Sequence, residues 1–240
     1  LSTYLRSRGA NCTCFIPERI SEGYGLNSEA IKTISRQCDV IITVDTGITA
    51  VEEVEYARSL GVDVVITDHH SCRDVLPAAV AVVDPCRVDD SYPYKALAGV
   101  GVVFKLVCAL EGNSAKVLEE YAELVAIGTI ADVMPLTDEN RLIVSAGLSL
   151  LEHTKRKGLA ALMKKTGVLK RGKRITASAI SFAIAPRLNA AGRIASATLA
   201  LKLIMAEDDE SADVIAERLC EINKLRHQTE QRITAEAAKQ

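Results

Sequence analysis

Two apolar, β-branched runs that each end in an aspartate constrain the fold of this chain most strongly. The first run precedes Asp45, the second precedes Asp68, and an amphipathic stretch over residues 50–60 lies between them. Two strands joined through a helix form a βαβ unit with parallel strands. Because the carboxyl ends of parallel strands meet at one edge of a sheet, Asp45 and the triplet Asp68-His69-His70 are expected to face the same crevice.

The segments around this unit predict strands at first and helices afterwards. Residues 12–16 and 79–85 have the composition of further strands, and a helix is expected to start at Ser28. Spacings near 3.6 residues predict four more helices, at residues 99–110, 115–127, 139–151 and 159–166. Asp132 is expected in the break over residues 128–135.

The predicted fold class is α/β. We expect a parallel sheet flanked by helices, then a mostly helical segment and a long connector helix. Residues 208–240 contain neither Gly nor Pro, which favours one long exposed helix there. The expected divisions are residues 1–150 for the α/β core, 151–207 for a helical part closing the cleft, and 208–240 for the connector.

Composition excludes several classes of protein. A chain of 240 residues with 48% hydrophobic content can bury a sizeable core. It has no apolar run of about 18 residues and its start does not resemble a signal peptide, so we expect a cytoplasmic protein without membrane contact. Its seven cysteines include no CxxC pair, which argues against a disulfide framework or a structural zinc site. A net charge of −2 means that nucleic-acid binding would need a local basic patch.

The acidic and imidazole side chains at the strand ends are ligand types of two-metal phosphoesterase sites. Asp45 can bridge two ions, and a mixed Asp and His set suits Mn²⁺ better than Ca²⁺. Each aspartate alone also fits the N-cap of a following helix, and a lone His69-His70 pair also fits a surface position. The conjunction of these residues with Asp132 is what favours a metal centre.

Several longer motifs resemble the DHH phosphoesterases, and within them the RecJ-type single-strand-specific exonucleases. The triplet at residues 68–70 gives the family its name. The other matching segments are residues 16–19, 22–26, 44–47, 66–70, 128–136, 139–141 and 186–193. The resemblance therefore spans nearly the whole chain, and it implies the fold of the DHH phosphoesterase core.

The resemblance also implies roles for individual residues. Asp45 would be the bridging ligand, and His69 and Asp132 would bind the second metal. Asp68 would orient His69, and His70 would contact the scissile phosphate. Three residues would face the substrate, although a helix cap and surface charge would also explain them: Arg187, Asn189 and Arg193.

The implied reaction is hydrolysis of single-stranded DNA from a 5′ end to mononucleotides, dependent on Mn²⁺ or Mg²⁺, in DNA repair and recombination. Single-stranded DNA is the implied partner, with a single-strand-binding protein and a helicase as further ones. Two other functions stay open. One is a DHH hydrolase of short oligonucleotides, cyclic dinucleotides or pyrophosphate, and the other is a non-catalytic replication factor.

Two family features have no counterpart in this sequence, namely an upstream acidic DxD-type motif and a C-terminal domain with a GGH motif. We therefore expect the chain to be a fragment that is inactive or very feeble alone. A run of basic residues between positions 155 and 174 could bind the phosphates of DNA. The equally weighted alternative is that it is only the solvated face of a helix and a loop. Its nine members are Lys155, Arg156, Lys157, Lys164, Lys165, Lys170, Arg171, Lys173 and Arg174.

Overall fold

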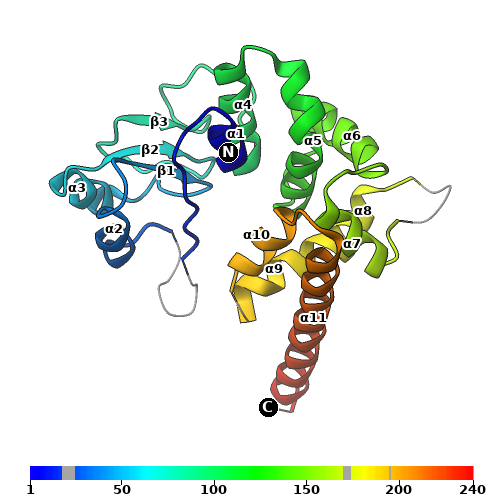
Figure 1. Cartoon of the computed structure of the whole chain (residues 1–240). Helices are drawn as coiled ribbons and strands as arrows, with labels where there is room; N and C mark the ends of the chain where they lie inside the picture. Colours follow the sequence, from blue (N-terminus) through cyan, green and yellow to red (C-terminus); the bar gives the residue numbers. More distant parts are fainter. Residues whose placement is uncertain (18–24, 170–173, 195, 240) are drawn as a thin grey trace. The chain divides into compact units, whose positions relative to one another are not determined.

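The computed structural model describes residues 1–17, 25–169, 174–194 and 196–239, as Figure 1 shows. These residues form two compact units, the first running to Gly147 and the second starting at Leu148. Both the expected segment 151–207 and the expected connector 208–240 lie in the second unit. No helix in the described part of the chain is long and apolar enough to cross a membrane.

The first unit is an α/β layer structure. In chain order its elements are α1 (Ser2–Ser7), α2 (Ser28–Ile34), β1 (Val40–Val44), α3 (Val51–Ser59), β2 (Asp63–Thr67), β3 (Ala81–Val83), α4 (Gly99–Glu111), α5 (Ser114–Ala131) and α6 (Asp138–Leu151), whose last turn enters the second unit.

The sheet has the strand order β1-β2-β3, with both pairs parallel. In the first pair the register runs from Val40 opposite Asp63 to Val44 opposite Thr67. The parallel βαβ unit predicted from the sequence is thereby confirmed. The third predicted strand also forms, over a shorter range than its apolar pattern indicated.

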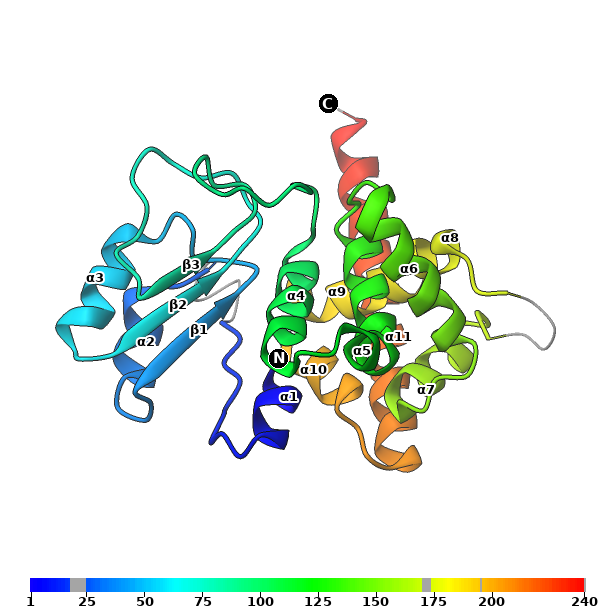
Figure 2. The same cartoon turned by 90° about the horizontal axis from the view of Figure 1, so that it is seen from above.

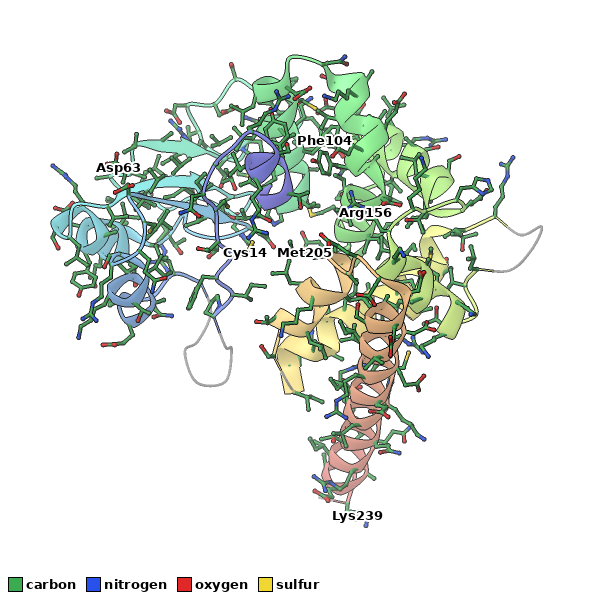
Figure 3. The ribbon with its side chains drawn as sticks, in the orientation of Figure 1. Cys14, Asp63, Phe104, Arg156, Met205 and Lys239 are labelled. Carbon is green, nitrogen blue, oxygen red and sulfur yellow. The ribbon has the colours of Figure 1, made fainter. Side chains whose placement is uncertain are left out.

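Helices cover both faces of this sheet, as Figure 2 shows: α2 and α3 lie on one face and α4 lies on the other. Alternate strand residues such as Ile41, Val64 and Ile66 are buried in one cluster with Val54 and Ala57 of α3. This period of two is what a strand with one face on a core requires. On the opposite side, α4 is strongly apolar, and its Phe104, labelled in Figure 3, is buried.

Two local predictions were wrong. Residues 12–16 form no strand, because among the described residues they pair with no strand, and Phe15 and Ile16 are exposed. The helix predicted to end at residue 127 continues to Ala131, so the break begins at Asp132. In that helix Gly128 packs against Val100 of α4, so a glycine that resembled a helix stop serves a close approach between helices.

The second unit is helical. Its elements are α7 (Lys157–Lys165), α8 (Ala177–Ala179), the π-helix η1 (Ile180–Ile184), α9 (Ala185–Ile194), α10 (Thr198–Ile204) and α11 (Asp209–Ala237). The long helix predicted at the C-terminal end is confirmed, with Asp208 accepting from the backbone N–H of Ser211 as its N-cap. Its first half is packed against α7, α9 and α10 through residues such as Ala216 and Leu219, so only its second half is exposed as predicted.

Part of the basic run is paired with acidic residues of α11. Lys157 lies 3.1 Å from Asp209 and Lys165 lies 2.8 Å from Glu217. These pairs join α7 to α11 and reduce the positive charge that the run could present to a phosphate backbone. Three members lie outside the described residues, namely Lys170, Arg171 and Lys173, and a role of the run in DNA binding stays a prediction.

The close packing of a glycine on α7 leads to a testable prediction about the stability of the second unit. A Cβ at Gly158 would collide with the carbonyl group of Leu203, whose carbon would be 2.6 Å away. We expect Gly158→Ala to lower the free energy of unfolding by about 2 kcal/mol, because backbone must move to admit the methyl group. Urea unfolding followed by circular dichroism measures this. Lys164→Ala, on the exposed side of the same helix, is the control, and equal stability of the two variants would refute the prediction.

Candidate metal centre

Asp45 lies at the carboxyl end of β1, where strand pairing fixes its position. Its backbone N–H donates to the carbonyl oxygen of Thr67, at 3.0 Å. Its φ of +61° is in the left-handed region, which aspartate adopts more readily than most residues. The side chain lies against Gly99 at the start of α4, where a Cβ would come within 2.6 Å of the Asp45 Cβ and 2.7 Å of its Cγ. The carboxylate thus occupies space that only a glycine leaves open.

Asp68 is almost fully buried, with 1% of its surface exposed, and its carboxylate is held from several sides. Its Oδ2 accepts from the backbone N–H of Ile48 at 2.9 Å, and its Oδ1 accepts from the backbone N–H of His69 at 2.8 Å. The same Oδ1 lies 2.7 Å from Nδ1 of His70. Burial raises the pKa of this carboxyl, but these hydrogen bonds outweigh it and hold the pKa below its usual value.

Asp68 was expected to orient His69. Its Oδ1 contacts the ring of His70 and the backbone N–H of His69, and an action on the ring of His69 stays a prediction. A hydrogen bond to Nδ1 leaves Nε2 of His70 available for a metal ion or a phosphate oxygen.

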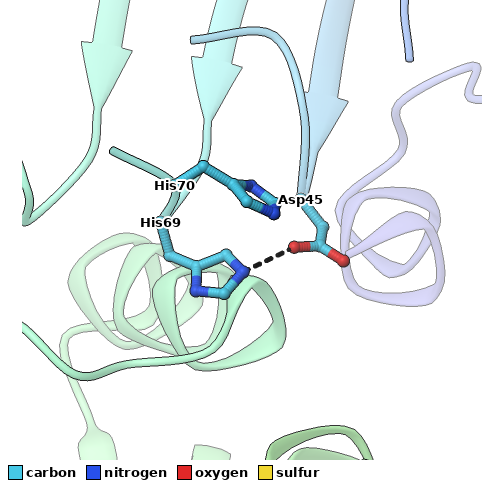
Figure 4. A group of neighbouring side chains, drawn as sticks. All are labelled: Asp45, His69 and His70. Carbon is cyan, nitrogen blue, oxygen red and sulfur yellow. Dashed lines mark ion pairs between the residues drawn. The ribbon is translucent and has the colours of Figure 1, made fainter. Parts of the chain in front are cut away.

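The ring of His69 is buried between two carboxylates. Its Nε2 lies 2.9 Å from Oδ1 of Asp45, drawn as a dashed line in Figure 4, and 3.4 Å from Oδ2 of Asp132. Only 7% of the side chain is exposed. The interaction with Asp45 raises the pKa of His69, burial opposes that shift, and the charges of Asp132 and Asp68 add to it. Two anionic oxygens beside one buried nitrogen favour either a proton or a bound cation at this point.

Asp132 is the C-cap of α5, and a Schellman motif follows it. The N–H of Val133 donates to Ile130 O and the N–H of Met134 donates to Thr129 O. The residue with left-handed φ in this motif is usually glycine, but here it is Val133, at φ +58°. The pKa of Asp132 is raised, chiefly by burial, with a contribution from the nearby charge of Asp45.

The side chains brought together here have the composition of a divalent-cation site. Ligand atoms of Asp45, His69 and His70 all lie within 4.8 Å of one another, and Figure 4 shows them below the carboxyl ends of the strands. Asp132 reaches the same His69 nitrogen from α5. Mixed oxygen and nitrogen donors suit Mn²⁺ and related ions. The convergence of two carboxylates on one imidazole also fits a cation, which would relieve their mutual repulsion.

The expected substrate residues lie on α9 in the second unit. Arg187 is half-buried, and its Nη1 donates to the carbonyl oxygen of Ala183 in the preceding π-helix, at 2.6 Å. Asn189 and Arg193 are exposed. Their action on a substrate stays a prediction.

Sequence reasoning missed two residues beside the centre. Gly99 is the first, and its signal was the cluster of small residues around the start of α4. Asp84 is the second. It follows β3 at the same sheet edge and is fully buried, so that the pKa of its carboxyl is raised, while its Oδ1 accepts from the backbone N–H of Cys86 at 2.7 Å. An acidic residue at a third strand end was the available signal.

The contact between Gly99 and Asp45 can be tested directly. Gly99→Ala should weaken Mn²⁺ binding by about tenfold or more, because the new methyl group displaces the carboxylate that faces His69. Isothermal calorimetry measures the affinity. Gly112→Ala, beyond the other end of α4, should leave the Mn²⁺ affinity unchanged: a Cβ there meets nothing within 4 Å, and the strain at its φ of +70° stays local to the helix end. Equal Mn²⁺ affinity of the Gly99→Ala variant and the unmodified chain would contradict the prediction.

The sequence of this chain is similar to those of known exonucleases. The chain is 45% identical over 236 residues to the single-stranded-DNA-specific exonuclease RecJ of Bacillus subtilis, covering 97% of this chain and 29% of that protein. It is 39% identical to the RecJ of Escherichia coli, covering 97% of this chain and 43% of that protein. The chain thus spans less than half the length of these relatives.

The fold of this chain is also similar to solved structures of RecJ. A crystal structure of exonuclease RecJ bound to manganese superimposes with a TM-score of 0.87 at 34% identity, covering 98% of this chain and 59% of that one. RecJ of Thermus thermophilus in complex with Mn²⁺ gives 0.84 at 32% identity, covering 100% of this chain and 34% of that one. Residues 1–129 match the model of the DHH family, N-terminal domain. This chain belongs to the DHH family.

Proposed function

We propose that this chain is the catalytic core of an enzyme that hydrolyses single-stranded DNA from its 5′ end to mononucleotides, with Mn²⁺ or Mg²⁺ as cofactor. The observation that carries the proposal is the convergence of Asp45 Oδ1 and Asp132 Oδ2 on His69 Nε2 at the carboxyl edge of a parallel sheet. The names of the relatives support the substrate, and RecJ structures with Mn²⁺ or Mg²⁺ support the cofactor.

In this proposal Asp45, His69 and Asp132 hold the metal. A bound cation of this type lowers the pKa of a coordinated water and takes up charge on the reacting phosphate. His70, whose Nδ1 lies 2.7 Å from Oδ1 of Asp68, would act as a charged donor from Nε2 to a phosphate oxygen when both ring nitrogens carry a proton. The residues Arg187, Asn189 and Arg193 bind the DNA strand.

The wider biological role is a proposal as well. Action in DNA repair and recombination, and contacts with a single-strand-binding protein and a helicase, are what the resemblance of the motifs implies. A cytoplasmic location is expected from the hydropathy of the sequence, which has no apolar run of about 18 residues. Affinity capture with this chain, followed by mass spectrometry of cell extract, tests the two protein partners, and the absence of both would remove them from the proposal.

A chimera tests the activity independently of where this chain begins and ends. The matched region of the Bacillus subtilis relative is replaced by this chain, which aligns with it over 97% of its length. We expect the chimera to release mononucleotides from single-stranded DNA with Mn²⁺, and Asp132→Asn in it to lower the rate at least about a hundredfold, since a metal ligand is weakened.

The substrate panel separates the proposal from its alternatives. Long single strands, dinucleotides, cyclic dinucleotides and pyrophosphate are compared at equal enzyme concentration. Faster turnover of the small substrates would favour the small-substrate hydrolase. A folded chimera that binds Mn²⁺ and cleaves none of them would favour the non-catalytic factor.

The raised pKa of His69 predicts how metal affinity depends on pH. A metal binds the neutral imidazole, so protons compete below the pKa, which lies above the usual value of about 6.5. Mn²⁺ affinity should therefore rise with pH by up to about tenfold per unit below that pKa and level off above it. Calorimetry across this range measures the slope. His227→Gln, in the second unit, should keep the slope, and an affinity that does not change with pH would contradict the prediction.

A further inference from the structure

Asn140 is a buried amide that joins two segments of the first unit. It lies in the first turn of α6 with only 1% of its surface exposed. Its Nδ2 donates to the carbonyl oxygen of Ala96 at 2.6 Å and to that of Pro135 at 2.9 Å. Both N–H groups of one side chain are therefore used to hold two backbone segments together.

Each of these segments supports one of the carboxylates beside His69. Ala96 lies just before α4, whose first residue, Gly99, contacts the side chain of Asp45. Pro135 follows the Schellman motif that ends α5 at Asp132. The amide of Asn140 thus connects the segment that precedes α4, which contacts Asp45, to the turn that follows Asp132.

The turn beyond Asp132 needs such a restraint. Val133 is β-branched, has φ +58° and is 84% exposed, so its own packing contributes little to holding this conformation. Left-handed backbone costs a residue of this type about 1–3 kcal/mol and persists where surrounding contacts fix it. The contacts that restrain the turn come after it, at Pro135, rather than from the side chain of Val133.

Neighbouring side chains reinforce the same connection. The hydroxyl of Tyr94 lies 3.2 Å from Pro135 O and 3.1 Å from Thr137 O. Glu139, in the first turn of α6, accepts from the hydroxyl of Tyr92 and lies 2.8 Å from Nζ of Lys105 on α4. The segment before α4 is therefore tied to the start of α6 by several hydrogen bonds, and Asn140, 1% exposed, is the most buried of the side chains that make them.

We propose that Asn140 is a positioning residue, which sets the distance between the carboxylates of Asp45 and Asp132 by tying Ala96 to Pro135. This inference deepens the proposed function and rests on it where it concerns the metal. The restraint of the turn after Asp132 by Asn140 is independent of metal binding. Asn140 itself touches neither the metal ligands nor the substrate in this role.

The substitution Asn140→Asp tests the proposal, because it keeps the size of the side chain and replaces both donors by an oxygen that faces two carbonyl groups. Amide hydrogen exchange in the metal-free chain is the first readout. We expect exchange at the N–H groups of Val133 and Met134 to become at least about tenfold faster. The second readout is Mn²⁺ affinity, which should fall about tenfold or more.

Asn223→Asp is the matched control, since Asn223 is a buried asparagine on α11 in the second unit. It should change neither readout. If Asn140→Asp does not fold, Tyr94→Phe removes the hydroxyl contacts to the same segment and should change both readouts in the same direction by a few-fold.

The outcomes separate the inference from the proposed function. Unchanged exchange at Val133 and Met134 overturns the inference, and so does faster exchange with unchanged Mn²⁺ affinity. If the unmodified chain binds no Mn²⁺, the proposed function has failed at the metal site, and the exchange rates alone then decide whether Asn140 restrains the turn.

Discussion

The parallel pairing of β1 with β2 is the constraint on which the rest of the site depends. With Val44 opposite Thr67, the next residues, Asp45 and Asp68, leave the sheet at the same level, so that His69 is placed beside Asp45. Antiparallel pairing would send the two strand ends to opposite edges and leave no common crevice. Concentrating carboxylates at one edge has an electrostatic cost, which a cation bound beside His69 would offset.

Strained backbone surrounds the site. Among the described residues, the non-glycine positions with positive φ are Asp45, Val133 and Asp138. The carboxylate of Asp45 is part of the site, and Val133 directly follows Asp132. Asp138 is the first residue of α6, the helix that contains Asn140. Each costs on the order of 1–3 kcal/mol, and such costs persist where the surrounding structure fixes them. Here the contact of Gly99 with Asp45 and the two hydrogen bonds of Asn140 provide that fixation.

The sequence was sufficient for the sheet and for the grouping of acidic and imidazole residues, because strand periodicity and the ends of parallel strands follow from local pattern. It was not sufficient for details that depend on tertiary contact. The glycine at position 128 read as a helix stop although it packs against Val100 inside α5. The partner of Asp68 could not be chosen between two adjacent histidines, since both lie within reach of its carboxylate. The amide of Asn140 gave no sign of its role, because one of its two acceptors, Ala96 O, lies 44 positions away in the sequence.

A Mn²⁺ titration by calorimetry shows whether Asp45, His69 and Asp132 form one metal site. The unmodified chain is compared with Asp45→Asn, His69→Ala and Asp132→Asn under identical conditions, with His227→Gln as control. We expect one site in the unmodified chain and in the control, and weaker or no binding in each of the three variants. If all three variants bind Mn²⁺ at full affinity, these residues do not form the site, since the metal would then be held elsewhere.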